Sequence, residues 1–421
     1  MARLLGVLFV LAMLAPGIAA AAARSEKGVE NSLIVVFKPG VGALELDQVL
    51  QAQGLTAVDR IPGLNVVLAE APAGRVAAAS AGLAQNPKVL MFGRDVWRSW
   101  IDAAPVSFQE TPMPGVETVL QSLPKLKAGS AAPVRRADSE IQWGVARVNA
   151  PAAWPTNQGA GVKVAVIDTG IDPNNSELTV AGGMNAIDEK APWADDHFHG
   201  THVAGIIAAA LNGQKTVGVA PKASLYAVKV LTKEGKGDMF AIMKGIDWCA
   251  QNGIKVANMS LGAPQEMPLI QYALQSAVSA GVTVIAAAGN DGKTVNWPAA
   301  YPETIAVSAL CPPGITETKL CPNALEGIAT FSSRGPQVAF IAPGVKIPST
   351  VPVSNDPSGV HAYSGTSMAT PHVAGLAALA VARGASGLNG VRAALTAAAV
   401  KLPGLSGDEQ GAGLIDAARF K

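Results

Sequence analysis

Five short and nearly continuous apolar runs recur along the larger, C-terminal part of the chain. They lie at residues 162–168, 224–231, 256–261, 282–289 and 304–310. Segments with the 3.6-residue spacing of helices lie between them, at 201–212, 239–253 and 269–281. Apolar runs of this length, rich in Val, Ile and Ala, are typical of parallel strands buried on both faces. The pattern predicts an α/β domain over residues 139–421, with a doubly wound, mostly parallel sheet and functional groups at the carboxyl ends of its strands.

A second pattern precedes this domain. Strand-like runs at 32–39, around 56–61, at 64–72 and at 89–97 alternate with helical spacing at 43–54 and 74–86. The order β-α-β-β-α-β predicts a small α+β domain of the ferredoxin-like type over residues 24–99. Residues 100–138 contain five prolines and no clean periodicity, which indicates a linker or processing segment. Its dibasic pair, Arg135 and Arg136, is either a processing point or a solvated pair.

The N-terminus has the pattern of an export signal. Arg3 provides the positive charge, residues 4–14 are apolar apart from Gly6, and small residues fill positions 19–23. This pattern predicts a cleaved signal peptide over residues 1–23, with an uncleaved membrane anchor as the alternative. We therefore expect an exported protein, secreted or periplasmic, with no membrane attachment after signal cleavage.

The composition of the chain favours a large packed core and argues against a highly charged binding partner. Hydrophobic residues make up 49% of the chain and charged residues 15%, and the formal net charge is +1. This balance gives no electrostatic case for binding nucleic acid or an anionic membrane surface.

Three cysteines are present. Cys311 and Cys321 stand ten residues apart, and in an exported protein this spacing predicts a small disulfide loop. Cys249 lies in a helical pattern and is expected to be a buried free thiol; the alternative, a catalytic Cys249, has no histidine near it in the sequence.

Three short motifs carry residues suited to catalysis. Asp168 follows an apolar strand in VAVIDTGID, His199 begins a helix in HGTHVAGI, and Ser367 begins another in GTSMATPHVAG. Asp-Thr-Gly after an apolar run is also typical of aspartic peptidases, but the chain has no second copy to supply the partner carboxylate. Ser367 by itself is a common type of helix N-cap.

His199 also has an alternative interpretation. The segment 195–202, DDHFHGTH, packs two aspartates and three histidines together, so a metal site is conceivable. However, its spacing differs from the HExxH of zinc peptidases, and no glutamate stands between the histidines.

Together the three motifs resemble the subtilisin family of serine peptidases, in which the triad follows the chain order Asp, His, Ser. The resemblance covers nearly all of residues 139–421 and includes NMSLG, AAAGN and FSSRGP. It implies a secreted serine endopeptidase in which Ser367 is the nucleophile, His199 the general base and Asp168 its partner. The oxyanion donors implied by the resemblance are the Asn290 side-chain amide and the Ser367 backbone N–H.

The same resemblance implies how a substrate binds. A peptide would lie as an added strand between two segments, Gly235-Lys236-Gly237 and Ser260-Leu261-Gly262. Leu261, Ala287, Ala288 and Gly289 are expected to line a fairly apolar pocket for the residue before the cleaved bond, with Asn296 near its base. No acidic residue clearly matches that base, so we expect broad specificity with an apolar preference rather than a strict preference for Arg or Lys.

The first domain resembles the inhibitory prodomain of the family. This implies an intramolecular inhibitor and folding assistant that the enzyme removes by self-cleavage.

The family resemblance also bears on metal binding. Glu177 matches a carboxylate that binds structural calcium in the family, so the resemblance allows one structural calcium. At the family's second calcium site Ala339 replaces the carboxylate, so no second calcium is expected. No cofactor is expected for catalysis, and we expect a monomer that acts on protein and peptide substrates.

Two other functions fit the same motifs less well. One is a processing protease with narrow specificity, which the sequence does not separate from a broad one. The other is a non-catalytic binding protein on the same fold, and the presence of the complete triad and Asn290 argues against it.

Overall fold

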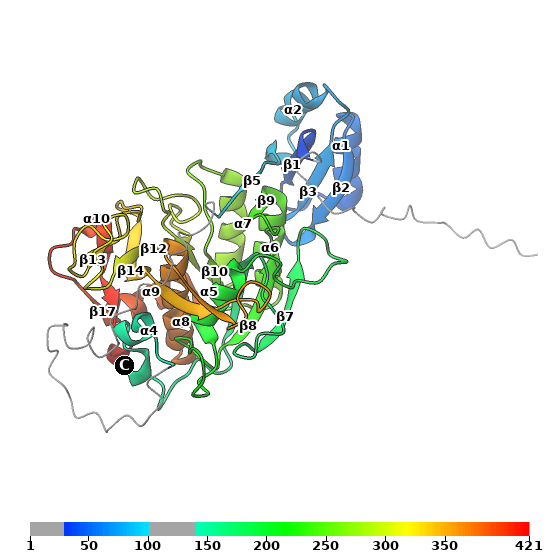
Figure 1. Cartoon of the computed structure of the whole chain (residues 1–421). Helices are drawn as coiled ribbons and strands as arrows, with labels where there is room; N and C mark the ends of the chain where they lie inside the picture. Colours follow the sequence, from blue (N-terminus) through cyan, green and yellow to red (C-terminus); the bar gives the residue numbers. More distant parts are fainter. Residues whose placement is uncertain (1–28, 102–139, 421) are drawn as a thin grey trace, which may run out of the picture.

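The computed structural model describes residues 29–101 and 140–420, which form a small N-terminal unit and a larger C-terminal one (Figure 1). The predicted signal peptide and almost all of the predicted linker lie outside the described residues. No helix in the described ranges is long and apolar enough to cross a membrane.

The N-terminal unit is the predicted β-α-β-β-α-β arrangement. Its elements are β1 (Ser32–Phe37), α1 (Ala43–Ala52), β2 (Thr56–Ile61), β3 (Val66–Glu70), α2 (Val76–Ala84) and β4 (Val89–Arg94). The four strands form an antiparallel sheet in the order β2-β3-β1-β4. The prediction of a small α+β domain is therefore confirmed.

Strand β1 is buried along its whole length because both faces of this sheet are covered. Leu33, Val35 and Phe37 pack with α1 and α2 in one cluster. Ile34 and Val36 point the other way and join the core of the C-terminal unit. The period-2 alternation of a strand thus divides β1 between two cores.

The C-terminal unit is a doubly wound sheet, as predicted. Its central order is β14-β12-β11-β10-β6-β8-β7, with all neighbours parallel. The strands are β6 (Lys163–Asp168), β7 (Val180–Asn185), β8 (Ser224–Lys229), β10 (Val256–Met259), β11 (Thr283–Ala287), β12 (Thr304–Cys311) and β14 (Val338–Pro343). The main helices are α5 (His199–Ala208), α6 (Met239–Gln251), α7 (Pro268–Ser279), α8 (Thr366–Ala382) and α9 (Gly387–Ala398).

Helices cover both faces of the sheet. On β6, Val164 and Val166 pack in the cluster that contains α5, α8 and α9. Ala165 and Ile167 pack in the cluster that contains α6 and α7. This alternation explains why the strands have nearly continuous hydrophobic sequences.

The remaining strands and α-helices are short and belong to the C-terminal unit, apart from β5, which precedes it in the sequence. They are β5 (Trp97–Ser99), α4 (Trp143–Arg147), β9 (Lys236–Asp238), β13 (Gly327–Ile328), β15 (Ile347–Thr350), β16 (Val360–Tyr363), β17 (Ala399–Val400), α10 (Gly407–Gln410) and β18 (Leu414–Ile415). Strand β5 follows the N-terminal unit in the sequence but pairs antiparallel with β9 of the C-terminal unit.

The N-terminal sheet lies against α6 and α7, and polar contacts surround its apolar face (Figure 1). Lys244 on α6 forms an ion pair with Asp59 at 2.8 Å. The Tyr272 hydroxyl on α7 donates to the Leu64 carbonyl at 3.1 Å. The Asp95 carboxylate accepts a hydrogen bond from the backbone N–H of Phe240 in the first turn of α6, where unpaired amides favour an anion.

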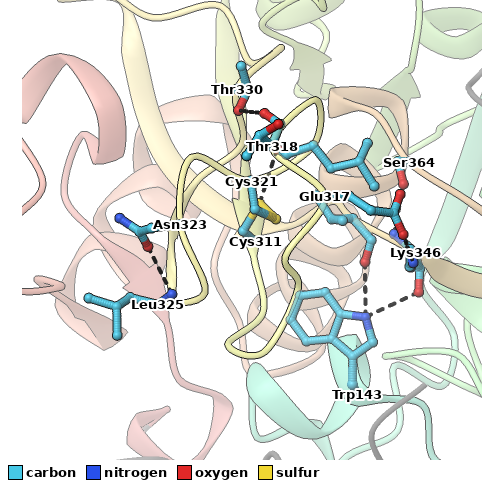
Figure 2. Close-up of a disulfide and its surroundings, with 12 residues drawn as sticks. Trp143, Cys311, Glu317, Thr318, Cys321, Asn323, Leu325, Thr330, Lys346 and Ser364 are labelled. Atoms are coloured by element: carbon cyan, nitrogen blue, oxygen red, sulfur yellow. Dashed lines mark hydrogen bonds and ion pairs between the residues drawn. A yellow bond between two sulfur atoms is a disulfide. The ribbon is translucent and has the colours of Figure 1, made fainter. Parts of the chain in front are cut away.

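Cys311 and Cys321 form the predicted disulfide at the end of β12 (Figure 2). Backbone and side-chain bonds hold the enclosed loop in place, including one from the Thr330 hydroxyl to the Thr318 carbonyl. Cys249 is a buried free thiol on α6, as predicted, and burial raises its pKa above the ordinary value.

Replacing both Cys311 and Cys321 by Ser is expected to lower the free energy of unfolding by roughly 3 kcal/mol, because the crosslink restricts a ten-residue span of the unfolded chain. Urea unfolding of the two proteins measures the difference. Reductant should destabilise the wild type and leave the double variant unchanged. Equal stability of the two proteins without reductant would contradict the prediction.

Candidate active site

Asp168, His199 and Ser367 come from three separate elements of the C-terminal unit. Asp168 is the last residue of β6, His199 is the first residue of α5, and Ser367 is the second residue of α8. All three side chains are buried or nearly so. Asp168 thus lies at a carboxyl end of the parallel sheet, where this architecture gathers functional groups.

Asp168 and His199 are in direct polar contact. Nδ1 of His199 lies 2.9 Å from each carboxylate oxygen of Asp168, and the two side chains are 1% and 0% exposed. Oδ1 of Asp168 also accepts the backbone N–H of Thr169 at 2.7 Å. An ionised carboxylate only accepts hydrogen bonds, so Nδ1 carries the proton and Nε2 is left as an acceptor.

Gly200 permits this contact. A Cβ on Gly200 would lie 2.0 Å from the carbonyl oxygen of Gly170, closer than any real side chain approaches backbone. The Thr169 hydroxyl also accepts the backbone N–H of Gly200 at 3.0 Å. The first turn of α5 can therefore lie directly against the loop after β6.

Ser367 is held by a different partner. Its hydroxyl donates to the Ser260 carbonyl at 3.2 Å, and the Ser260 hydroxyl donates to the Ser367 carbonyl at 2.9 Å. Among the described residues no hydrogen bond joins the Ser367 hydroxyl to His199. The structure thus brings Asp168 to His199, and Ser367 to the strand end at Ser260.

Asn290 lies beside Ser367 with a fixed amide orientation. Its Oδ1 accepts both the backbone N–H and the hydroxyl of Thr366 at 2.8 Å. A backbone N–H can only donate, so the atom facing it is the oxygen, and the amide NH₂ is left as a donor. Asn290 and Ser367 line one pocket.

That pocket contains most of the residues predicted to bind substrate. It is lined by Trp100, Ile101, Ser260, Leu261, Gly262, Ala287, Gly289, Asn290, Asn296, Thr366 and Ser367. Gly289 has a φ of +113°, and a Cβ there would lie 2.6 Å from Nδ2 of Asn296. Ala288 differs from the expectation: it is fully buried in the core on the α6 and α7 side, because alternate residues of a strand face opposite sides.

The other predicted substrate segment, Gly235-Lys236-Gly237, faces the chain's own strand β5. Ser99 pairs with Lys236 and Arg98 with Gly237. Trp100 continues the contact, because its N–H donates to the Gly235 carbonyl and its carbonyl accepts the Gly262 N–H, each at 3.0 Å. The groove between the two segments therefore holds residues 97–101. Trp100 lies in the predicted linker, whose proline-rich sequence gives no signal of this contact.

Comparison with models of known protein families identifies the family of the larger unit. The model of the subtilase family matches residues 159–413, which is more than half of the chain. The chain belongs to the subtilase family. A second model, the fervidolysin N-terminal prodomain, matches residues 15–91. The predicted resemblance to a subtilase with an N-terminal prodomain is therefore confirmed.

Several named subtilases are similar to this chain. Subtilisin E of Bacillus subtilis (strain 168) is 45% identical over 251 residues, which cover 58% of this chain and 61% of the relative. Subtilisin of Bacillus pumilus is 44% identical over 251 residues, 58% of this chain and 85% of the relative. The alkaline protease of Shouchella clausii is 41% identical over 281 residues, 65% of this chain and 70% of the relative. The chain thus spans 61% of the length of subtilisin E.

The remaining acidic and histidine side chains of the DDHFHGTH segment have structural partners in this subtilase. Asp195 accepts both the hydroxyl and the N–H of Thr201, and burial raises the pKa of its carboxyl. Nε2 of His202 contacts the carbonyls of Ile347 and His361, and burial lowers its pKa to about 3. Within the described residues, no group of three or more His, Cys, Asp or Glu side chains is placed to hold a metal.

Gly200→Ala tests the close approach of α5 to the loop after β6. The new Cβ must displace backbone, so we expect the free energy of unfolding to fall by roughly 2–3 kcal/mol. Gly390 on α9 is a matched helical control: a Cβ there meets no atom within 4 Å, so Gly390→Ala should be neutral or stabilising by up to about 1 kcal/mol. Urea unfolding in a Ser367→Ala background measures both, and equal effects of the two substitutions would contradict the prediction.

Proposed function

We propose that this subtilase is an exported serine endopeptidase that hydrolyses peptide bonds through Asp168, His199 and Ser367, and that it is made as a self-processing preproenzyme. The observation that carries the proposal is the buried Asp168–His199 pair, together with a pocket lined by Ser367 and by Asn290, whose amide NH₂ has no acceptor among the described residues. These are the groups that acyl transfer needs: a nucleophile, a base, a partner that orients the base, and an oxyanion donor.

Each group has a defined task in the reaction. A serine hydroxyl is a weak nucleophile at neutral pH and requires an adjacent base. The Ser367 hydroxyl turns from the Ser260 carbonyl toward Nε2 of His199, which takes its proton as Oγ attacks the substrate carbonyl carbon. The carbon–nitrogen bond then breaks, and His199 gives the proton to the leaving amine. Water, deprotonated in turn by His199, releases the acid from the acyl-enzyme.

The tetrahedral intermediate requires donors for its oxygen. Asn290 is preorganised for this task because Thr366 fixes its Oδ1 from two sides, so its NH₂ need not reorient during the reaction. The backbone N–H of Ser367 is the second donor. Asp168 holds the imidazole of His199 in the tautomer that leaves Nε2 free and stabilises the imidazolium that forms.

Substrates bind as an extended strand between Gly235-Lys236-Gly237 and Ser260-Leu261-Gly262. The contacts of residues 97–100 with these segments support this mode, because they are main-chain bonds that do not depend on side-chain identity. Leu261, Ala287 and Gly289 give the pocket a partly apolar lining, and Asn296 adds one amide. The proposed specificity is therefore broad, with an apolar preference before the cleaved bond.

The N-terminal unit acts as the intramolecular inhibitor. It fills the proposed substrate groove with residues 97–101 and covers α6 and α7 with its sheet. A substrate cannot enter the groove until this segment leaves. The proposed monomer is exported by the signal sequence; this sequence and the dibasic pair Arg135-Arg136 lie outside the described residues.

A structural calcium at Glu177 is part of the proposal, and it has no role in catalysis. The Glu177 carboxylate is buried and accepts the Asn212 amide at 3.2 Å. Glu140, which sequence analysis did not single out, accepts the N–H of Gly213 in the same loop at 2.8 Å, and its other oxygen is a buried acceptor without a donor among the described residues. Such oxygen ligands suit Ca²⁺.

Replacing Ser367 by Ala is expected to abolish both digestion of casein and loss of the N-terminal unit, because no nucleophile remains. Intact mass and N-terminal sequencing of the exported chains measure processing. Ser386 is the N-cap of α9 and, like Ser367, lies at the N-terminal end of a helix, so Ser386→Ala is the control and should process normally. Equal trimming of the Ser367→Ala chain, or digestion of casein by it, would refute the proposed function.

A further inference from the structure

The groove holds the end of the N-terminal unit by its backbone on both sides. Trp100 bonds to Gly235 through its N–H and to Gly262 through its carbonyl. Its indole N–H also donates to the Gly237 carbonyl at 2.9 Å. The next residue, Ile101, lines the same pocket as Ser367 and Asn290. If the proposed function is correct, the peptide bond after Ile101 is therefore the bond presented to the active site.

The Ile101 carbonyl is bound by a side chain of its own segment. The Ser99 hydroxyl donates to this oxygen at 2.7 Å. Strand β5 ends at Ser99, and the chain bends at Ile101 instead of continuing as an extended strand. In the described part of the chain, neither the Asn290 amide nor the Ser367 N–H bonds to the Ile101 oxygen.

This conformation differs from the one that cleavage requires. Attack on a peptide carbonyl needs the oxygen aimed at the oxyanion donors and the nucleophile aligned with the carbon. Here Ser99 directs the oxygen of Ile101, and the Ser367 hydroxyl bonds to the Ser260 carbonyl at 3.2 Å. A carbonyl oxygen can accept two hydrogen bonds, so the bond from Ser99 does not prevent the Ile101 oxygen from accepting another. Ser99 restrains this oxygen by the direction in which it holds the carbonyl group.

We propose that Ser99 is a positioning residue that slows self-cleavage: its hydroxyl holds the Ile101 carbonyl away from the oxyanion donors and keeps the precursor latent. When this bond opens, the carbonyl turns toward Asn290 and the Ser367 N–H. A bond then forms between Ser367 Oγ and the Ile101 carbonyl carbon, and the bond from that carbon to the nitrogen of residue 102 breaks. The Ser367 proton passes through His199 to the leaving amine, and water hydrolyses the ester.

Ser99 is well suited to this role because its side chain does little else. Ser99 is an exposed residue, so truncation of its side chain removes little buried surface from either unit. The backbone pairing of Ser99 with Lys236 does not depend on the hydroxyl. An alanine at this position should therefore keep the groove contacts and lose only the bond to Ile101.

The test compares four full-length chains: wild type, Ser99→Ala, Ser99→Thr and Ser80→Ala. Each is refolded from denaturant, and intact mass against time gives the rate of cleavage after Ile101. Losing one hydrogen bond of this kind should speed self-cleavage in Ser99→Ala about tenfold. Ser99→Thr keeps the hydroxyl and should match the wild type. Ser80 lies on α2, away from the groove, so Ser80→Ala should also match it.

A second readout separates this inference from the proposed function. Ser99 leaves with the N-terminal unit, so all four processed enzymes should digest casein equally. If casein is digested but Ser99→Ala self-cleaves at the wild-type rate or more slowly, the inference on Ser99 is wrong and the proposed function stands. A new N-terminus other than residue 102 in the wild type also overturns the inference. If none of the chains digests casein, both proposals fail.

Discussion

The close approach of helix α5 to the end of strand β6 is the constraint on which the site depends. Gly200 permits backbone contact with Gly170 where a side chain on α5 would collide, and this places His199 against Asp168 inside the protein. Burial removes water from the pair, so the bond between them is stronger and more directional than it would be at the surface. The proposed chemistry needs this fixed imidazole, because Nε2 can act as a base only when Nδ1 is held by another partner.

The two units are joined through strand β1, which contributes side chains to the cores of both. β1 is buried on both faces, with one face under α1 and α2 and the other against α6 and α7. Each large aliphatic side chain on the shared face contributes roughly 1.5–3 kcal/mol by leaving water, which is large relative to the stability of a small domain. The same docking carries residues 97–101 into the groove, so the interface that stabilises the N-terminal unit also blocks the proposed substrate site.

Hydrophobic period was enough to predict most of the fold. The strands at 163–168 and 283–287 are buried on both faces, and their continuous apolar sequences indicate this burial. The ten-residue spacing of Cys311 and Cys321 likewise predicted their disulfide, because a short loop is enough to bring the two residues together. The structure of the segment after Arg94 was harder to predict from the sequence. Trp100 and Ile101 lie between a short strand and a proline-rich stretch, and Trp100 is held by backbone bonds to glycines that are distant in the sequence. The bond between Ser367 and Ser260 has no sequence signal, since it depends on a hydroxyl rotamer.

The central claim is that His199 makes Ser367 the reactive nucleophile of this subtilase. A fluorophosphonate probe tests it most directly, because it forms a stable adduct only with an activated serine. Mass spectrometry of the processed enzyme should locate a single adduct on Ser367. The His199→Ala chain, freed of its N-terminal unit by added wild-type enzyme, should give none. Absence of an adduct, an adduct on another serine, or equal labelling of the His199→Ala chain would contradict the account.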